Sequence, residues 1–193
     1  MLDLCNKLVD NNLSKENLLE KIEIRKTSEE DFEKICMTLT KAFGLSSTSE
    51  AAFQLLNSNA KLNESVKIVD KENGDIYGLL IFCQYPIQIG SPIKLINENL
   101  SMLLENFSQL NGHSFVIDER LRNCGLDKKM LLFNTQFIKD NYDFLWIGVE
   151  NTLRSHNYWK RLGFIEIFQI EEATFYMIPL SHKFIKNIFG DNL

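Results

Sequence analysis

The sequence has 193 residues, of which 45% are hydrophobic, so the chain can build one substantial core, and we expect a single domain with additions. Its 21 basic and 26 acidic residues give a formal net charge of −5, which disfavours a nucleic acid as partner. No run of about 18 apolar residues is present, and Asp3 stands where a signal peptide carries basic residues, so we expect a cytoplasmic protein without a membrane partner.

The cysteines and histidines of the chain are dispersed. None of the 4 cysteines belongs to a CxxC pair, which disfavours both a zinc site and a dense disulfide scaffold, so we expect free thiols. The 3 histidines also lie far apart, and we expect them to be structural. The sequence therefore predicts no metal site.

The first part of the chain combines an arm with a strand and a helix. Residues 1–20 are typical of short helices, with Ser14 at an N-cap position. Residues 22–25 alternate apolar and polar side chains like a short strand. Thr27 and Glu30 have the spacing of a capping box, which predicts a helix start. The apolar face of that helix consists of Phe32, Ile35, Cys36, Leu39 and Phe43.

The middle of the chain indicates a β-hairpin between two helical segments. A less regular helix is expected through residues 51–56. Strands at residues 65–69 and 76–85 flank Asn73-Gly74, a strong turn signal. From Pro92 to Gly112 the apolar residues return to helical spacing, which predicts another helix with one apolar face.

The second half alternates strands and helices. Strands are expected at residues 113–117, 144–149, 164–170 and 174–178, and helices at about 126–140 and 155–161. The whole order is β-α-α-β-β-α-β-α-β-α-β-β, without an internal repeat, which indicates an α/β protein.

The segment that points to a function is the strand, turn and helix at residues 114–131. A helix that starts directly after a strand presents free backbone N–H groups and the positive end of its dipole, which suit a phosphate. Gly125 in the turn lets the backbone approach a ligand closely. Neither GxxxxGK[ST] nor GxGxxG is present, which excludes the two commonest nucleotide fingerprints. A phosphate site and a purely structural turn both remain open.

Two motifs carry a resemblance to a known family. The segment Arg122-Asn-Cys-Gly-Leu-Asp127 resembles the pyrophosphate loop of the GNAT superfamily of N-acetyltransferases, which reads Arg or Gln, two residues, Gly, one residue, then Gly or Ala. Asp127 departs from that pattern. Downstream, Val149-Glu-Asn151 is followed by Trp159-Lys-Arg-Leu-Gly-Phe164, which is similar to the family's Tyr-Glu-Lys-Leu-Gly-Phe. The resemblance covers roughly residues 22–180.

The resemblance implies a fold and a domain organisation. We expect a GNAT-like α/β fold, with a mixed, mostly antiparallel sheet that has splayed central strands and is flanked by helices. The splayed strands would be those at residues 113–117 and 144–149. The organisation would be an N-terminal helical arm (1–20), an acetyltransferase domain (21–180) and a C-terminal tail (181–193).

The resemblance also implies acetyl-CoA as cosubstrate and an amine as acceptor, with direct attack of the amine on the thioester. The pantetheine arm would pair with the strand that ends at Ile117, whose backbone N–H would receive the acyl carbonyl. The implied cofactor-binding residues are Ile117, Asp118, Glu119, Arg122, Asn123, Cys124, Gly125, Leu126, Asp127, Lys128, Asn151 and Trp159.

The candidate catalytic residues are two glutamates and a tyrosine. Glu119 and Glu150, at the ends of the splayed strands, could serve as the base or be solvated surface acids. Trp159 occupies the family's tyrosine position, and an indole cannot protonate a thiolate. Tyr158 could do so only if its hydroxyl turned into the cleft, and we expect Trp159 to face the cleft instead, since neighbouring helical side chains diverge. The Asp127 carboxylate should point away from a pyrophosphate or be offset by lysines.

Several alternatives remain open at this point. The chain could be a domain of the same fold that is weakly active or inactive and binds CoA or a protein partner. The apolar face of residues 92–112 should pack on the sheet, but it could instead cover the acceptor site or form a homodimer. The motifs leave the acceptor unidentified.

Overall fold

The computed structural model describes residues 16–84, 107–151, 155–169 and 171–181. Residues 16–21 are helical. The further elements are β1 (Ile22–Lys26), η1 (Glu29–Asp31), α2 (Phe32–Phe43), α3 (Thr48–Asn57), η2 (Leu62–Glu64), β2 (Val66–Asp70), β3 (Ile76–Cys83), β4 (Gln109–Ile117), η3 (Glu119–Leu121), α6 (Leu126–Ile138), β5 (Phe144–Glu150), α7 (His156–Arg161), β6 (Ile165–Gln169) and β7 (Ala173–Pro179).

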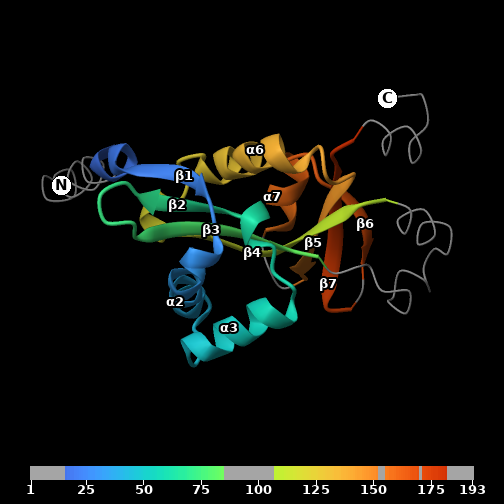
Figure 1. The fold of residues 1–193 in the computed structure, drawn as a ribbon. Coiled ribbons are helices and arrows are strands. Elements are labelled where there is room, and N and C mark those ends of the chain that lie inside the picture. Colours follow the sequence, from blue (N-terminus) through green and yellow to red (C-terminus); the bar gives the residue numbers. More distant parts are fainter. Residues whose placement is uncertain (1–15, 85–106, 152–154, 170, 182–193) are drawn as a thin grey trace, which may run out of the picture.

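The described strands form one mixed sheet in the order β1-β2-β3-β4-β5-β7-β6. Neighbouring strands are antiparallel except for β4 and β5, which run parallel. Helices α2 and α3 lie on one side of the sheet, and α6 and α7 lie on the other (Figure 1). The predicted fold class, a mostly antiparallel sheet flanked by helices, is confirmed. Among the described residues, none of the helices combines the length and the apolar character that a membrane crossing requires.

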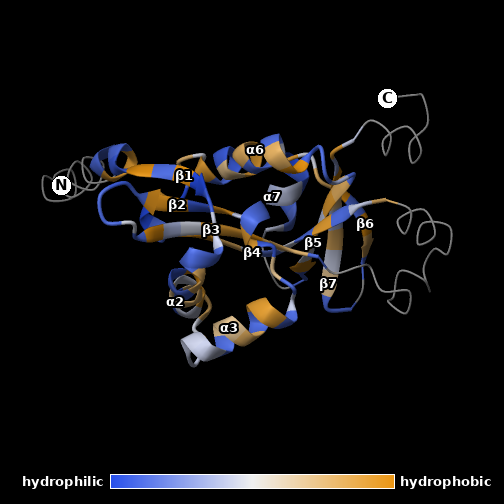
Figure 2. Cartoon of the chain, viewed as in Figure 1, coloured by the Kyte–Doolittle hydropathy of each residue, from blue (hydrophilic) through white to orange (hydrophobic). Residues whose placement is uncertain are grey.

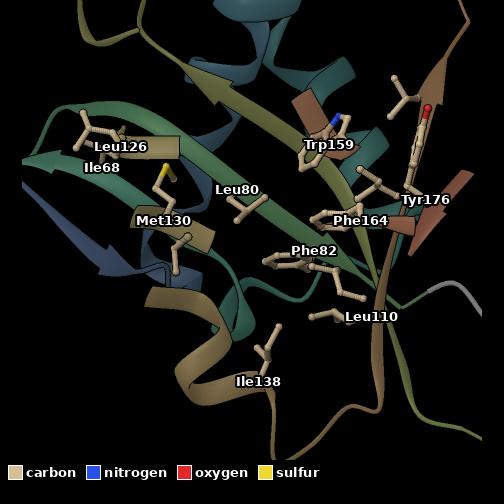
Figure 3. Close-up of a cluster of buried hydrophobic side chains, with 14 of the residues drawn as sticks. Ile68, Leu80, Phe82, Leu110, Leu126, Met130, Ile138, Trp159, Phe164 and Tyr176 are labelled. Atoms are coloured by element: carbon tan, nitrogen blue, oxygen red, sulfur yellow. The ribbon is translucent and has the colours of Figure 1, made fainter. Parts of the chain in front are cut away.

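Two apolar cores hold these layers together. The larger one joins the sheet to α6 and α7, with Leu80 and Phe82 from β3 meeting Met130 of α6 and Trp159 of α7 (Figure 3). The smaller one joins the opposite face of the sheet to α2 and α3. Hydrophobic residues accordingly run along the strands, while the turn between β2 and β3 is hydrophilic (Figure 2). Full burial of each large side chain contributes about 1.5–3 kcal/mol.

The predicted hairpin of β2 and β3 is confirmed, and its turn is held by an aspartate. The Asp70 carboxylate accepts hydrogen bonds from the backbone N–H groups of Glu72 (2.8 Å) and Asn73 (3.2 Å). Gly74 has a φ of 72°, the left-handed conformation that the Asn-Gly signal indicated. The strand predicted at residues 76–85 ends at Cys83 within the described residues.

The capping box predicted at Thr27 and Glu30 is wrong by one residue. Ser28 is the N-cap, and it exchanges hydrogen bonds with Asp31 at the start of η1. The Thr27 hydroxyl instead donates to the backbone carbonyl of Leu62, which joins the end of β1 to η2. Asp31 also forms an ion pair with Lys67 of β2.

Two other sequence predictions need correction. Of the predicted helix at residues 92–112, residues 92–106 lie outside the described structure, and residues 109–112 belong to strand β4 instead. Phe43 was expected in the buried face of α2, but its side chain is 54% exposed. Ile35, Cys36 and Leu39 are buried as predicted. Of the predicted arm and tail, Ser14 and residues 182–193 also lie outside the described residues.

Candidate functional site

The central strands β4 and β5 pair over only part of their length. The parallel ladder joins Gln109–Gly112 of β4 to Phe144–Ile147 of β5 and then stops. Beyond it, β4 continues to Ile117 and β5 to Glu150 without pairing to each other. The splay that the sequence resemblance implied is therefore present.

The splay begins at a bulge in β4. Gly112 pairs with Phe82 of β3, but Ser114 pairs with Ile81, which leaves His113 as an extra residue. A bulge bends its strand and increases the local twist. The bend lies next to Gly112, the last residue of β4 that pairs with β5, so the bulge turns the rest of β4 away from β5.

The open edge of β4 presents unpaired backbone groups to the gap. The Asp118 N–H donates to the Tyr77 carbonyl on the β3 side (2.8 Å). Because bonding direction alternates along an antiparallel strand, the backbone groups of Val116 also face β3, whereas those of Phe115 and Ile117 face β5. An extended ligand can pair with these free groups as an added strand.

A cavity of about 320 Å³ occupies this gap. Its wall comes from both splayed strands and from two helices. Its lining includes His113, Ser114, Phe115, Glu150, Tyr158 and Trp159, together with Phe43 of α2. Tyr158 and Trp159 thus both line the cavity, although the sequence predicted that Trp159 alone would face it.

The turn after β4 leads to an uncapped helix start. Gly125 is the N-cap of α6 with a φ of 70°, and no side chain of the described residues caps this end. The first backbone bond of the helix runs from the Lys129 N–H to the Gly125 carbonyl (3.1 Å), so the N–H groups of Leu126, Asp127 and Lys128 have no partner within the helix. These donors and the helix dipole make a place for an anion.

The other residues of this turn fix its shape or remain at its surface. Arg120 forms an ion pair with Asp118 (2.8 Å), and this contact holds the pKa of Asp118 below its ordinary value. Asn123 takes a left-handed conformation, with a φ of 61°. The half-buried Cys124 thiol contacts the Arg122 carbonyl (3.7 Å) inside the turn. Arg122, Asn123 and Lys128 are exposed, whereas Leu126 is buried in the main core.

Asp127 lies beside Tyr158 of α7. Burial raises the pKa of Tyr158, and the nearby Asp127 carboxylate raises it further. The Tyr158 hydroxyl is buried and has no hydrogen-bond partner of good geometry among the described residues. A tyrosine in this setting keeps its proton at neutral pH.

Trp159 forms the apolar wall of the cavity. Its side chain is 8% exposed and packs against Phe115 of β4 (ring centroids 5.7 Å apart) and Phe164 (5.2 Å). Figure 3 shows Trp159 above Phe164 in the cluster of buried apolar side chains. The indole therefore contributes packing to the site and links α7 to the open edge of β4.

The end of β5 is held by contacts that the sequence did not reveal. The Asn151 amide donates to the Glu171 carbonyl (2.8 Å) and accepts from the Thr174 hydroxyl (2.7 Å), so its side chain lies toward β7. His156 lies within hydrogen-bond distance of the Glu150 carbonyl (3.1 Å) and of the Tyr176 hydroxyl (2.9 Å). His156 was expected only to be structural, and no motif indicates its position at the mouth of the splay.

The two glutamates predicted as bases lie in different cavities. Glu150 is exposed and lines the cavity between the splayed strands. Glu119 lines an adjoining cavity of about 670 Å³, together with Lys41, Arg120 and Arg122. Phe43 and Phe115 line both cavities, which therefore meet at these rings.

Comparisons with solved structures agree on one fold. An acetyltransferase of the GNAT family from Staphylococcus aureus superposes with a TM-score of 0.54 at 16% identity, over 83% of this chain and 99% of that one. The chain has the GNAT fold. The ribosomal-protein-S18-alanine N-acetyltransferase from Escherichia coli superposes with a TM-score of 0.55 at 14% identity, over 89% of this chain and 98% of that one. The PaiA N-acetyltransferase from Thermoplasma acidophilum in complex with coenzyme A superposes with a TM-score of 0.55 at 11% identity, over 82% of this chain and 98% of that one. The sequence matches no protein-family model and no curated protein sequence.

Proposed function

We propose that the chain is an N-acetyltransferase that moves an acetyl group from acetyl-CoA to an amine by direct attack. The observation that carries this proposal is the open edge of β4, which leads straight to the uncapped start of α6. The open edge of β4 supplies backbone partners for an extended pantetheine arm, and the start of α6 supplies N–H donors for a pyrophosphate. The GNAT fold of a neighbour that is in complex with coenzyme A supports the same reading.

Each part of the cofactor has a matching set of groups. The amides of the pantetheine arm pair with the backbone of Phe115 and Ile117. The pyrophosphate meets the N–H groups of Leu126, Asp127 and Lys128, with positive charge from Arg122 and Lys128 nearby. The acyl carbonyl accepts a backbone N–H of the same strand edge, which stabilises the negative charge that develops on its oxygen.

The reaction needs no covalent intermediate on the protein. The amine nitrogen attacks the thioester carbon, a C–N bond forms, and the C–S bond breaks to release the CoA thiolate. One proton must leave the amine, and one must reach the thiolate. Tyr158 lines the cavity and is the donor for the thiolate in this proposal; because its raised pKa opposes a free tyrosinate, the hydroxyl must regain a proton as it gives one away. Trp159 packs beside it and limits the access of water.

A second candidate function is a GNAT-fold domain that binds CoA or a protein partner without catalysis. The buried Trp159 at the family's tyrosine position favours it. So does the Asn151 side chain, because its amide is already bonded to the turn before β7. Where the non-catalytic domain binds CoA, the two functions predict the same cofactor binding and differ only in turnover.

The test measures binding and turnover on one preparation. Acetyl-CoA at a hundred times its dissociation constant should stabilise the protein by about 2.7 kcal/mol. Pantetheine, which lacks the pyrophosphate and the adenosine, should bind far more weakly. Release of the CoA thiol in the presence of methoxyamine or spermidine then reports turnover. Binding without turnover would support the non-catalytic alternative that binds CoA, and no binding at all would overturn the transferase and leave only the alternative that binds a protein partner.

A further inference from the structure

His113 lies at the origin of the splay and lines its cavity. It is the bulged residue of β4, beside the last residue that pairs with β5. Its side chain is half-buried and faces the same cavity as Tyr158 and Trp159. The sequence alone placed it at the far end of its strand, as a structural residue, because the bulge cannot be read from the residue pattern.

A hydrogen bond fixes the orientation of the imidazole. His113 Nδ1 lies 2.7 Å from Ser114 Oγ. When Nδ1–H donates to that hydroxyl, the lone pair of the ring is on Nε2, which has no hydrogen-bond partner among the described residues. Ser114 pairs with Ile81, a member of the core under α2 and α3, so the bonded pair lies on that side of the sheet. Tyr158 and Trp159 line the cavity from the opposite, α7 side.

We infer that His113 is the general base of the proposed transfer: Nε2 accepts a proton from the amine nitrogen as that nitrogen attacks the acetyl-CoA carbonyl carbon. The inference rests on the proposed function. The C–N bond forms while the C–S bond breaks, the imidazole holds the amine's proton, and the thiolate takes a proton from Tyr158 on the other side. The imidazolium passes its proton through solvent back to Tyr158 in the same step, so that no free tyrosinate accumulates and atoms and charges balance.

The surroundings of the ring favour this role over the two glutamates. Burial lowers the pKa of His113, so the ring is neutral and able to accept a proton at neutral pH. Glu119 lines the other cavity, and the exposed Glu150 stands at the mouth. Phe43 of α2 lines the same cavity as His113, so an amine that enters it from the α2 side would lie near the imidazole.

The test uses acetyl-CoA and methoxyamine, a small amine that is uncharged across the pH range examined and needs no dedicated acceptor pocket. His113→Asn keeps an amide near Nδ1 for Ser114 but removes Nε2, and His113→Ala removes the whole ring. Both should lower kcat by about a hundredfold or more. The dissociation constant of acetyl-CoA should stay within about twofold, because the cofactor contacts backbone groups of Phe115 and Ile117. Added imidazole should restore turnover to the Ala variant only.

A pH profile adds a readout that a structural role would not change. The parent should lose kcat/KM as the pH falls below about 6.5, because a protonated imidazole accepts no proton, and the Asn variant should lack this limb. The other titratable groups that line the cavity are Glu150 and Tyr158. Unchanged turnover and an unchanged profile in both variants would overturn the role of His113 alone. An inactive parent that still binds acetyl-CoA would overturn the proposed function and this inference with it.

Discussion

At the residue scale, the first prediction concerns the Tyr158 hydroxyl. Tyr158→Phe should lower kcat by about a hundredfold and leave acetyl-CoA affinity unchanged, because the hydroxyl gives its proton to the thiolate and makes no contact with the cofactor's phosphates. Folding stability should change by less than about 1 kcal/mol, because the hydroxyl lies beside the Asp127 carboxylate but makes no hydrogen bond of good geometry among the described residues. Steady-state kinetics, calorimetry and urea unfolding measure the three quantities.

Tyr142 offers a matched control for that substitution. It is also buried, at 8% exposed, and burial also raises its pKa, but it does not line the cavity between the splayed strands. Tyr142→Phe should therefore leave kcat within about twofold. If the two variants had equal turnover, Tyr158 would not be the acid, and the thiolate would leave unprotonated or take its proton from water.

The sequence could predict some of these residues and not others. The Arg-x-x-Gly turn and the Tyr158-Trp159 pair were found because each is a short motif with local geometry. His113 was not, because its place at the cavity depends on a bulge that appears only when β4 pairs with β3. Asn151 follows the motif, yet its amide contacts Glu171 and Thr174, which the chain brings back only through the β6–β7 hairpin.

At the scale of the elements, two glycines that flank helices make a matched pair. Gly125 starts α6 with a φ of 70°, and Gly44 ends α2 with a φ of 62°. An added Cβ would meet no atom within 4 Å at either position. Gly125→Ala and Gly44→Ala should therefore each cost about 1–2 kcal/mol of stability through the left-handed backbone alone. Only Gly125→Ala should also weaken acetyl-CoA binding, by about tenfold or more, which equals about 1.4 kcal/mol.

Thermal unfolding and calorimetry on both variants separate the two effects. Equal losses of stability with unequal losses of affinity would assign the turn before α6 to the cofactor. Equal affinities would remove Gly125 from the site, whatever the stability, because the strain of the left-handed backbone is common to both positions.

Element boundaries were predicted well where one local signal dominated and poorly where two competed. The Asn-Gly turn fixed the β2–β3 hairpin. Thr27 with Glu30 and Ser28 with Asp31 have the same spacing, and the tertiary contact from Thr27 to Leu62 selected the second pair. Residues 109–112 continue a helical pattern, but their parallel pairing with β5 makes them strand. Periodicity carries no information about such a distant partner.

At the scale of the whole molecule, acid should destabilise the protein in two steps. His113 has a lowered pKa because of burial, so the unfolded chain binds its proton first as the pH falls. Burial raises the pKa of Asp31, but hydrogen bonds from Lys67 and Ser28 reverse this and leave it lowered. Backbone N–H groups of Glu72 and Asn73 lower the pKa of Asp70. All three groups therefore favour the folded state most when they are deprotonated.

The sign of each contribution fixes the two pH windows. The stability that His113 contributes is fully present above its pKa in the unfolded chain, about 6.5, and is lost as the pH falls toward its lower pKa in the folded protein. The stability that the two aspartates contribute is present above their pKa in the unfolded chain, about 3.9, and is lost as the pH falls below it. Unfolding by urea should therefore show a midpoint that falls once below about pH 6.5 and again below about pH 4. His113→Asn should remove the first fall and keep the second, whereas Asp31→Asn should weaken only the second. If the urea midpoint of the His113→Asn variant still fell below about pH 6.5, that fall would belong to another histidine. The lowered pKa of His113 would then have no support, because such a shift exists only if folding disfavours the protonated ring.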